Sequence, residues 1–195
     1  MSSRERSDRE KWEELYATGK RGDRPPSAWI ASVLEHLPND RPLADIAGGT
    51  GRHAVVAAGL GFEVVLVDIV EAAVRRARVA SPRIAGVVAG VSALPLLPDA
   101  FGTVVVSNFL NRQLFPELIA LLAPGGHLVY ETYSIAHLEL VRAGLAQGPS
   151  SPEYLLQPDE LPKLVTPLEI VRYEESEVND EAGRRHSARL LARRP

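Results

Sequence analysis

The stretch Asp45-Ile46-Ala47-Gly48-Gly49-Thr50-Gly51-Arg52 joins a short apolar run to the start of a helical pattern. Glycines at such a junction permit positive φ and let backbone N–H groups approach a ligand that a Cβ would exclude. In open α/β sheets, ligands bind at the carboxyl ends of the strands, where this junction lies. The stretch therefore predicts a nucleotide-type site at the edge of a sheet.

Short apolar runs alternate with helical patterns on both sides of this stretch. Parallel strands that are buried on both faces have such continuous runs of Val, Ile and Leu. The expected strands are residues 43–47, 63–68, 84–89, 102–107 and 127–132, and the expected helices are residues 52–59, 71–80 and 112–122. Repeated strand and helix units predict an α/β fold with a doubly wound, mostly parallel sheet.

The end of the chain has a different pattern. Two strand-like runs, residues 168–178 and 185–193, flank the turn-forming segment 179–183. This pattern predicts a C-terminal antiparallel hairpin that completes a seven-stranded sheet.

The beginning of the chain is helical. Trp12, Leu15 and Tyr16 share one helical face, residues 29, 33 and 37 share another, and residues 19–26 between them form a loop. We therefore expect one domain of residues 1–195, with residues 1–40 as a helical lid and residues 41–195 as the α/β core.

Composition limits the class of protein. The 195 residues are 45% hydrophobic and 24% charged, as in one globular domain, and the absence of cysteine excludes thiol catalysis and disulfides. Residues 1–20 lack an apolar segment, so we expect a cytoplasmic protein with no membrane partner. The net charge of −3 predicts no nucleic-acid partner, and the arginines of the last twelve residues are interpreted as solvated charge. We expect no metal, and a monomer or homodimer.

Two carboxylates give the glycine stretch its specificity. Asp68 ends the second strand about twenty residues after the loop and is placed to accept hydrogen bonds from both ribose hydroxyls of an adenosine. Residues 49–54 also match the G-x-G-x-x-G/A dinucleotide fingerprint, so the glycines alone suit NAD. Asp45, just before the loop, would repel a pyrophosphate and suits a ligand with a cationic amino group.

Several motifs in a fixed order resemble those of class I S-adenosylmethionine-dependent methyltransferases. They are residues 45–52, 64–68, 94–101, 104–112 and 122–130, and the resemblance extends from about Trp12 to Leu191. Within the family, the short N-terminal helices and residues 154–161 look most like the tellurite-resistance, small-molecule branch. The resemblance implies S-adenosylmethionine as cofactor, S-adenosylhomocysteine as product and a small-molecule methyl acceptor. It assigns cofactor binding to Asp45, Ala47, Gly48, Gly49, Gly51, Asp68, Ile69, Val91, Ser92, Asn108 and Phe109.

Three positions depart from the family pattern. Ala47 stands where the family has the first glycine of the loop, and Gly90 stands where an Asp commonly accepts the adenine amino group. The tellurite branch has a His-Arg pair near the final hairpin, where this chain has residues 177–179; Arg185 matches the later arginine of that branch.

No catalytic base is obligatory, because the sulfonium is already activated and the protein mainly aligns the reactants. The candidates for a catalytic role are Arg112, which could attract an anionic acceptor, His53 as a base, Tyr16 over the sulfonium, and Arg185. Trp29 and Tyr133 are further candidates for an aromatic lid, although both tryptophans fit a core-facing helical stripe. His127 and His137 are interpreted as structural.

Two other functions fit parts of the sequence. An NAD(P)-binding oxidoreductase shares the glycine loop, but Asp45 and the C-terminal hairpin count against it. An inactive cofactor-binding module that serves as an interaction surface is the second alternative, favoured by Gly90 and the missing His-Arg pair.

Overall fold

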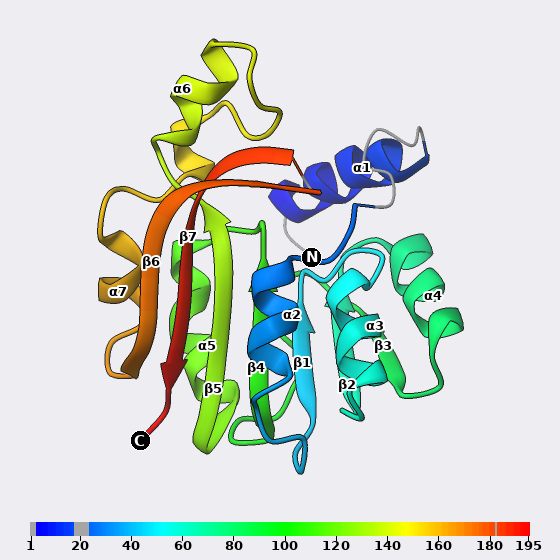
Figure 1. Ribbon diagram of the computed structural model, residues 1–195. Coiled ribbons are helices and arrows are strands. Elements are labelled where there is room, and N and C mark those ends of the chain that lie inside the picture. Colours follow the sequence, from blue (N-terminus) through cyan, green and yellow to red (C-terminus); the bar gives the residue numbers. More distant parts are fainter. Residues whose placement is uncertain (1–2, 18–23, 182) are drawn as a thin grey trace.

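Seven strands form one sheet in the order β3-β2-β1-β4-β5-β7-β6 in the computed structural model, which describes residues 3–17, 24–181 and 183–195 (Figure 1). Strands β1 to β5 are parallel to one another, and β7 runs antiparallel to both β5 and β6. The strands are β1 Leu43–Ile46, β2 Val64–Asp68, β3 Ile84–Val88, β4 Phe101–Ser107, β5 Leu122–Tyr133, β6 Glu169–Asp180 and β7 Gly183–Arg193. The predicted doubly wound sheet with its C-terminal hairpin is confirmed.

Helices cover both faces of the sheet. The helices are α1 Ser3–Ala17, α2 Ala28–Leu34, α3 Arg52–Gly59, α4 Glu71–Ala80, η1 Arg112–Leu114, α5 Phe115–Leu121, α6 His137–Arg142, η2 Pro152–Tyr154 and α7 Glu160–Leu164. Side chains of α2, α3 and α4 pack in one apolar cluster, and those of α5 and α7 pack in a second cluster on the opposite face. No helix in the described part of the chain is both long and apolar enough to span a bilayer.

Alternate residues of each strand point to opposite faces, as the pleat of a β-strand requires. Val104 and Val106 of β4 join the cluster with α5, whereas Val105 joins the cluster with α2, α3 and α4. Both faces therefore need apolar residues, which explains why β4 has a continuous apolar run.

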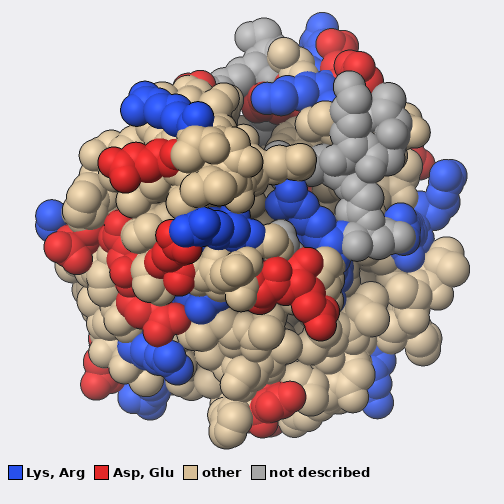
Figure 2. Space-filling view, turned by 45° about the horizontal axis from the view of Figure 1, so that its top comes forward, with Lys and Arg blue, Asp and Glu red and all other residues tan. Residues whose placement is uncertain are grey.

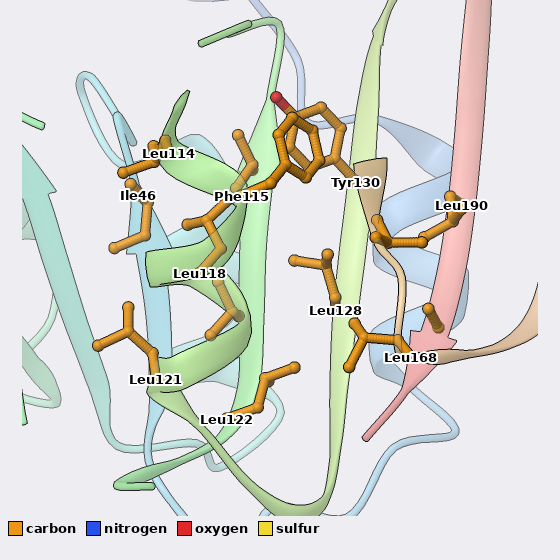
Figure 3. Close-up of a cluster of buried hydrophobic side chains, with 14 of the residues drawn as sticks. Ile46, Leu114, Phe115, Leu118, Leu121, Leu122, Leu128, Tyr130, Leu168 and Leu190 are labelled. Carbon is orange, nitrogen blue, oxygen red and sulfur yellow. The ribbon is translucent and has the colours of Figure 1, made fainter. Parts of the chain in front are cut away.

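The α5 cluster also fixes the loop after β4. Figure 3 shows Phe115 of α5 beside Tyr130 of β5, and their rings stack at 5.1 Å between centroids. The Tyr130 hydroxyl donates a hydrogen bond of 2.7 Å to the backbone carbonyl of Phe109. This bond anchors the loop that follows β4 at the carboxyl edge of the sheet.

Some predicted boundaries were wrong. The helix predicted over residues 112–122 is a 3-10 turn followed by α5, because Asn111 caps the turn and Pro116 occupies the first turn of the α-helix. The predicted five-residue hairpin connection is also too long. Asp180 pairs with Gly183 at the ends of β6 and β7, so only residues 181–182 connect the two strands.

The two N-terminal helices have different environments. Trp29, Ile30 and Leu34 of α2 are buried against the sheet with α3. In Figure 1, α1 lies instead across the top of the molecule, above the carboxyl edge of the parallel strands. Residues 19–23 of the predicted loop 19–26 lie outside the described residues.

Candidate functional site

A cavity of about 800 Å³ lies along the carboxyl edge of the parallel strands, beneath α1. Ten of the eleven predicted cofactor-binding residues line it: Asp45, Ala47, Gly48, Gly49, Asp68, Ile69, Val91, Ser92, Asn108 and Phe109. The structure thus brings together residues from four strand ends. Gly51, the eleventh, is not in the cavity wall.

The glycines of the loop have distinct roles. Gly51 has φ of 81° and precedes α3, and a Cβ there would lie 2.6 Å from the Cβ of Ala77 on α4. Gly51 therefore lets α3 and α4 pack closely. Gly49 has φ of +57°, and a Cβ there would lie 2.5 Å from the hydroxyl of Tyr16. The Gly49 backbone is therefore in close contact with α1.

Two residues other than glycine adopt the left-handed conformation in the cavity wall. Ala47 follows β1 and Asn108 follows β4, and each has φ of 54°. This conformation costs an L-residue about 1–2 kcal/mol. Residues strained in this way are concentrated at functional sites, where the surrounding structure holds them in place.

Asp45 has a buried carboxylate in the cavity wall. Its side chain is 1% exposed, and neither carboxylate oxygen has a hydrogen-bond partner among the described residues. Burial raises the pKa of Asp45 to about 7, and the charge of Arg52 and the backbone N–H of Ala54 oppose this rise only in part. A buried charge of this kind is costly unless it is paired, so the site suits a cationic ligand group.

Asp68 is held by the backbone around it. Its Oδ2 accepts a hydrogen bond of 2.8 Å from the N–H of Gly49, and its Oδ1 accepts one of 2.9 Å from the N–H of Val70. Burial raises the pKa of Asp68, and these backbone donors oppose that rise. Each oxygen keeps a further lone pair for a ligand hydroxyl.

His53 and Arg112 lie in the cavity wall with occupied polar groups. Nε2 of His53 accepts a hydrogen bond of 3.0 Å from the N–H of Ser27, and burial lowers the pKa of His53 to about 3. Arg112 donates to both carboxylate oxygens of Glu160 and to the carbonyls of Glu153 and Leu155. His53 thus attaches α3 to the start of α2, and Arg112 connects η1 to the segment before α7.

The remaining candidates are placed differently. Tyr16 of α1 lines the cavity, whereas Trp29 is buried in the sheet core. The ring of His137 packs 4.6 Å from that of Tyr133, and His127 pairs with Thr103 at the opposite end of β4. Neither histidine lines the cavity.

Several wall residues were missed or misassigned from the sequence. Asp8, Trp12 and Tyr16 all line the cavity and follow one another at i, i+4 and i+8 on α1. The prediction that Trp12 faces the core was wrong, because α1 crosses above the sheet edge and its aromatic stripe covers the cavity. The same i+4 spacing would have included Asp8. Arg24 and Tyr154 are in segments without a periodic pattern.

A narrow recess of about 10 Å³ adjoins the cavity near β4 and β5. The cavity and the recess share four wall residues: Arg24, Arg52, Ser107 and Asn108. The other wall residues of the recess are Ser27, Glu131, Tyr133 and Arg185. Figure 2 shows that basic and acidic side chains lie side by side on this face of the molecule.

Glu131 is the acidic residue of this recess and is 1% exposed. Its carboxylate pairs with Arg185 at 3.1 Å and with Arg189 at 3.3 Å, and it also accepts a hydrogen bond from the Ser27 hydroxyl. Arg185 pairs in addition with Asp180 at 2.6 Å. Arg185 therefore lies in a buried ion-pair network at the rear of the recess.

The other C-terminal arginines also pair with acids. Arg184 pairs with Glu177 at 2.7 Å, Arg193 lies 3.8 Å from Glu169, and Arg194 pairs with Asp99. The arginine cluster seen in the sequence is thus distributed over several ion pairs along the hairpin.

Comparisons with known proteins agree with this geometry. Residues 43–126 match a family model described as a methyltransferase domain. A demethylmenaquinone methyltransferase from Clavibacter sepedonicus is 33% identical over 110 residues, which are 52% of this chain and 45% of that protein. A 23S rRNA (guanine(748)-N(1))-methyltransferase from Streptomyces fradiae is 38% identical over 104 residues, which are 52% of this chain and 37% of that protein. The chain therefore matches less than half the length of either relative.

The fold has close structural relatives. The crystal structure of a SAM-dependent methyltransferase from Methanosarcina mazei superposes with a TM-score of 0.69 at 22% identity, over 84% of this chain and 96% of that one. S-adenosylmethionine is the cofactor that this fold and the matched domain imply. Residues 43–126 are thus similar to methyltransferase domains, and the chain has the fold of the class I S-adenosylmethionine-dependent methyltransferases.

Proposed function

We propose that the protein transfers the methyl group of S-adenosylmethionine to a small-molecule acceptor. The observation that carries this proposal is Asp45, a buried carboxylate in the cavity wall without a hydrogen-bond partner among the described residues. The cationic amino group of the cofactor would neutralise it, whereas the pyrophosphate of NAD would be repelled. Asp45 thus favours the methyltransferase over the oxidoreductase.

The cavity residues fit the other parts of the cofactor. Gly48 and Gly49 let the methionine and ribose portion approach the backbone, and Asp68 would accept hydrogen bonds from the ribose hydroxyls. The adenine would lie between Ile69 and the segment Gly90-Val91-Ser92, which also lines the cavity. Because Gly90 has no side chain, we expect the adenine amino group to bind to backbone or water.

The reaction is an in-line displacement at the methyl carbon. When bound, the cofactor supplies an electrophilic methyl group on a sulfonium. Asp45 and Asp68 would hold the cofactor, which would supply the methyl group for the acceptor and would leave as a neutral thioether. The protein's part is to orient the two reactants and to exclude water. Good alignment of reactants lowers the activation free energy by roughly 7–11 kcal/mol.

None of the neighbouring side chains is required as a base. His53 is neutral, and its Nε2 already accepts the Ser27 N–H. Acceptors that are nucleophilic without deprotonation, such as thiolates or oxyanions, need no base. This favours an anionic or otherwise activated acceptor.

The cover over the cavity supports a small acceptor. Asp8, Trp12 and Tyr16 of α1 and Tyr154 of η2 line the cavity from above the sheet edge. Lys11 of α1 also lies 5.8 Å from the centroid of the Tyr154 ring, which connects the two covering elements. We propose that α1 acts as the lid and that α2 belongs structurally to the core.

Titration calorimetry with S-adenosylhomocysteine and with NADH tests the cofactor. We expect binding of the nucleoside thioether and none of NADH, and Asp45→Asn should weaken the former. Tight NADH binding without a response to S-adenosylhomocysteine would show that the protein is an oxidoreductase.

A transfer assay with radiolabelled cofactor tests the acceptor. The panel comprises tellurite, selenite, thiols, phenols, quinones and ribosomal RNA, with the cofactor-binding variant Asp68→Ala as the negative control. Label in a small molecule supports the proposal, and label in RNA alone contradicts it. Cofactor binding without transfer to any acceptor would favour the inactive binding module.

A further inference from the structure

We infer that the acceptor carries an anionic group, a carboxylate or a phosphate-type oxyanion, which binds between Arg24 and Arg52 at the recess beside the cofactor cavity. This inference rests on the proposed function and specifies the class of acceptor. It follows from where the recess lies, which charges in it are unpaired, and how much space it offers.

The position of the recess follows from the strand order. Asp68 ends β2, and Asp45 is near the end of β1, so a cofactor that contacts both carboxylates occupies the β2 and β1 side of the edge. The recess lies on the other side, near the ends of β4 and β5, where Ser107 and Tyr133 contribute to its wall. Asn108 belongs to both walls. A second reactant at the recess would therefore lie next to the cofactor.

Neither Arg24 nor Arg52 at the recess lies within ion-pair distance of a carboxylate among the described residues, although the charges of Asp45 and Glu131 act on Arg52 from farther away. Arg52 donates to the carbonyl of Pro25 at 3.2 Å and to the hydroxyl of Ser107 at 2.9 Å. Arg24 donates to the hydroxyl of Tyr133 at 3.3 Å. All these acceptors are neutral, and an arginine has five N–H donors, so both guanidinium groups can bind further acceptors. Elsewhere in the chain, Arg83, Arg112, Arg184 and Arg194 each pair with a carboxylate.

Glu131, the acidic residue of the recess, does not form an ion pair with Arg24 or Arg52. Glu131 is already paired with Arg185 and Arg189 at the rear of the recess. Arg24 and Arg52 are only half-buried and face the shared wall of the cavity and the recess. Planar guanidinium groups in such a position bind carboxylate and phosphate oxygens with good geometry.

The size of the recess and its surroundings restrict the ligand further. A volume of about 10 Å³ is close to that of one water-sized group, so it admits an oxygen of an oxyanion and little more. The rest of the acceptor would lie in the main cavity, whose wall includes Trp12, Phe109 and Tyr154. An acceptor with an anionic group on an aromatic or apolar body fits both parts. The positive recess would repel a cationic amine.

Calorimetry on the protein saturated with S-adenosylhomocysteine tests this inference with model anions. The probes are benzoate and phenylphosphonate, which separate carboxylate from phosphate-type recognition, and neutral benzamide as the isosteric control. We expect at least one anion to bind at least about tenfold more tightly than benzamide. Equal binding of anions and benzamide, or no binding of either anion, would overturn the inference.

Variants assign the binding to the recess. Arg24→Gln and Arg52→Gln should each weaken anion binding at least about tenfold, while Arg52→Lys retains part of it. The matched control is Arg184→Gln on the exposed hairpin, which should leave anion binding unchanged. Among the described residues, Arg24→Gln loses one hydrogen bond, to Tyr133. Unaltered anion binding in this variant would contradict the proposed site even if the Arg52 variants misfold.

The affinity for S-adenosylhomocysteine separates this inference from the proposed function. If the wild-type protein does not bind the nucleoside thioether, the proposed function fails. If it binds the thioether but shows no preference for anions, the inferred anion site is wrong and the proposed function still holds.

Discussion

The backbone N–H of Gly49 donates a hydrogen bond of 2.8 Å to Oδ2 of Asp68, which joins the loop after β1 to the end of β2. Asp68 therefore both shapes the glycine loop and presents its remaining lone pairs to the cavity. This double role makes it more sensitive to substitution than an ordinary carboxylate at the end of a strand.

Replacing Asp68 with alanine should weaken binding of S-adenosylhomocysteine at least about tenfold, because the ribose loses its acceptor and the Gly49 N–H loses its partner. Calorimetry measures the change. The exposed Asp40, substituted in the same way, should have no effect. Unchanged affinity in Asp68→Ala would remove this residue from the site.

Asp45 should make cofactor binding depend on pH. Burial raises its pKa from 3.8 to about 7, so below that pH the carboxyl is neutral and cannot pair with a cationic amino group. We expect the affinity for S-adenosylhomocysteine to fall as the pH decreases from 8 to 5.5, with proton release on binding near pH 6. Asp45→Asn should bind weakly and lose this dependence. A wild-type affinity that is flat over this range would contradict the prediction.

The substitution Asp45→Asn should also stabilise the ligand-free protein above pH 7. A carboxyl group whose pKa is higher in the folded than in the unfolded state stabilises the fold at low pH. This stabilisation is lost as the pH rises through the folded-state pKa. The pKa shift from 3.8 to about 7 corresponds to a loss of roughly 4 kcal/mol of unfolding free energy above pH 7, at 1.36 kcal/mol per pKa unit. At pH 8, Asp45→Asn should therefore have a higher Tm than the wild type without ligand, and at pH 4 the difference should largely vanish. A lower Tm at pH 8 would contradict this interpretation.

His53 should prove structural when replaced by leucine. The variant leaves the buried N–H of Ser27 without its acceptor, which costs about 1–3 kcal/mol of unfolding free energy at pH 7.5. The folded-state pKa of about 3 lies below the ordinary 6.5, so the unfolded chain binds the extra proton and wild-type stability decreases as the pH falls below 6.5. His53→Leu should lose less stability between pH 7.5 and 5 than the wild type in urea denaturation. The exposed His36→Leu serves as control.

Glu131 should be among the most sensitive polar residues of the fold. Glu131→Gln removes one of the carboxylate partners of the buried Arg185 and also the charge that faces Arg189. Breaking a buried ion pair in this way lowers the unfolding free energy by about 3–5 kcal/mol. The exposed pair Arg193–Glu169 provides the contrast, since Glu169→Gln should change stability by less than about 1 kcal/mol. Equal effects in chemical denaturation would refute the difference.

A double-mutant cycle at Gly49 and Tyr16 tests whether α1 lies against the loop in solution. Gly49→Ala should destabilise the protein, because the new methyl would meet the Tyr16 hydroxyl and the backbone has φ of +57°. Tyr16→Phe removes that hydroxyl and should offset part of the loss, with a coupling of at least about 0.5 kcal/mol. Strict additivity of the two substitutions would show that α1 is not held there.

Much of the fold was predictable because it depends on local patterns. Helices α3 and α4 have the predicted boundaries, and β1 to β4 each differ from prediction by one residue, since continuous apolar runs and 3.6-residue periodicity need no distant partner. Strand β5 begins at Leu122, five residues before its predicted start. Boundaries set by contacts were predicted less well. The hairpin turn is shorter because Asp180 and Gly183 pair across it, and a helix was merged with the 3-10 turn that Asn111 caps.

For the site, the sequence by itself determined which residues the strand ends would bring together, because parallel strands place Asp45, Asp68 and Asn108 at one edge. Only the tertiary structure decided how these groups are paired, since that depends on contacts between distant segments. It left Asp45 without a partner, gave Arg112 and Arg185 carboxylates, and left Arg24 and Arg52 with neutral acceptors only, among the described residues. It also placed the aromatic stripe of α1 over the cavity, because a helical pattern defines a face and not the surface that this face covers.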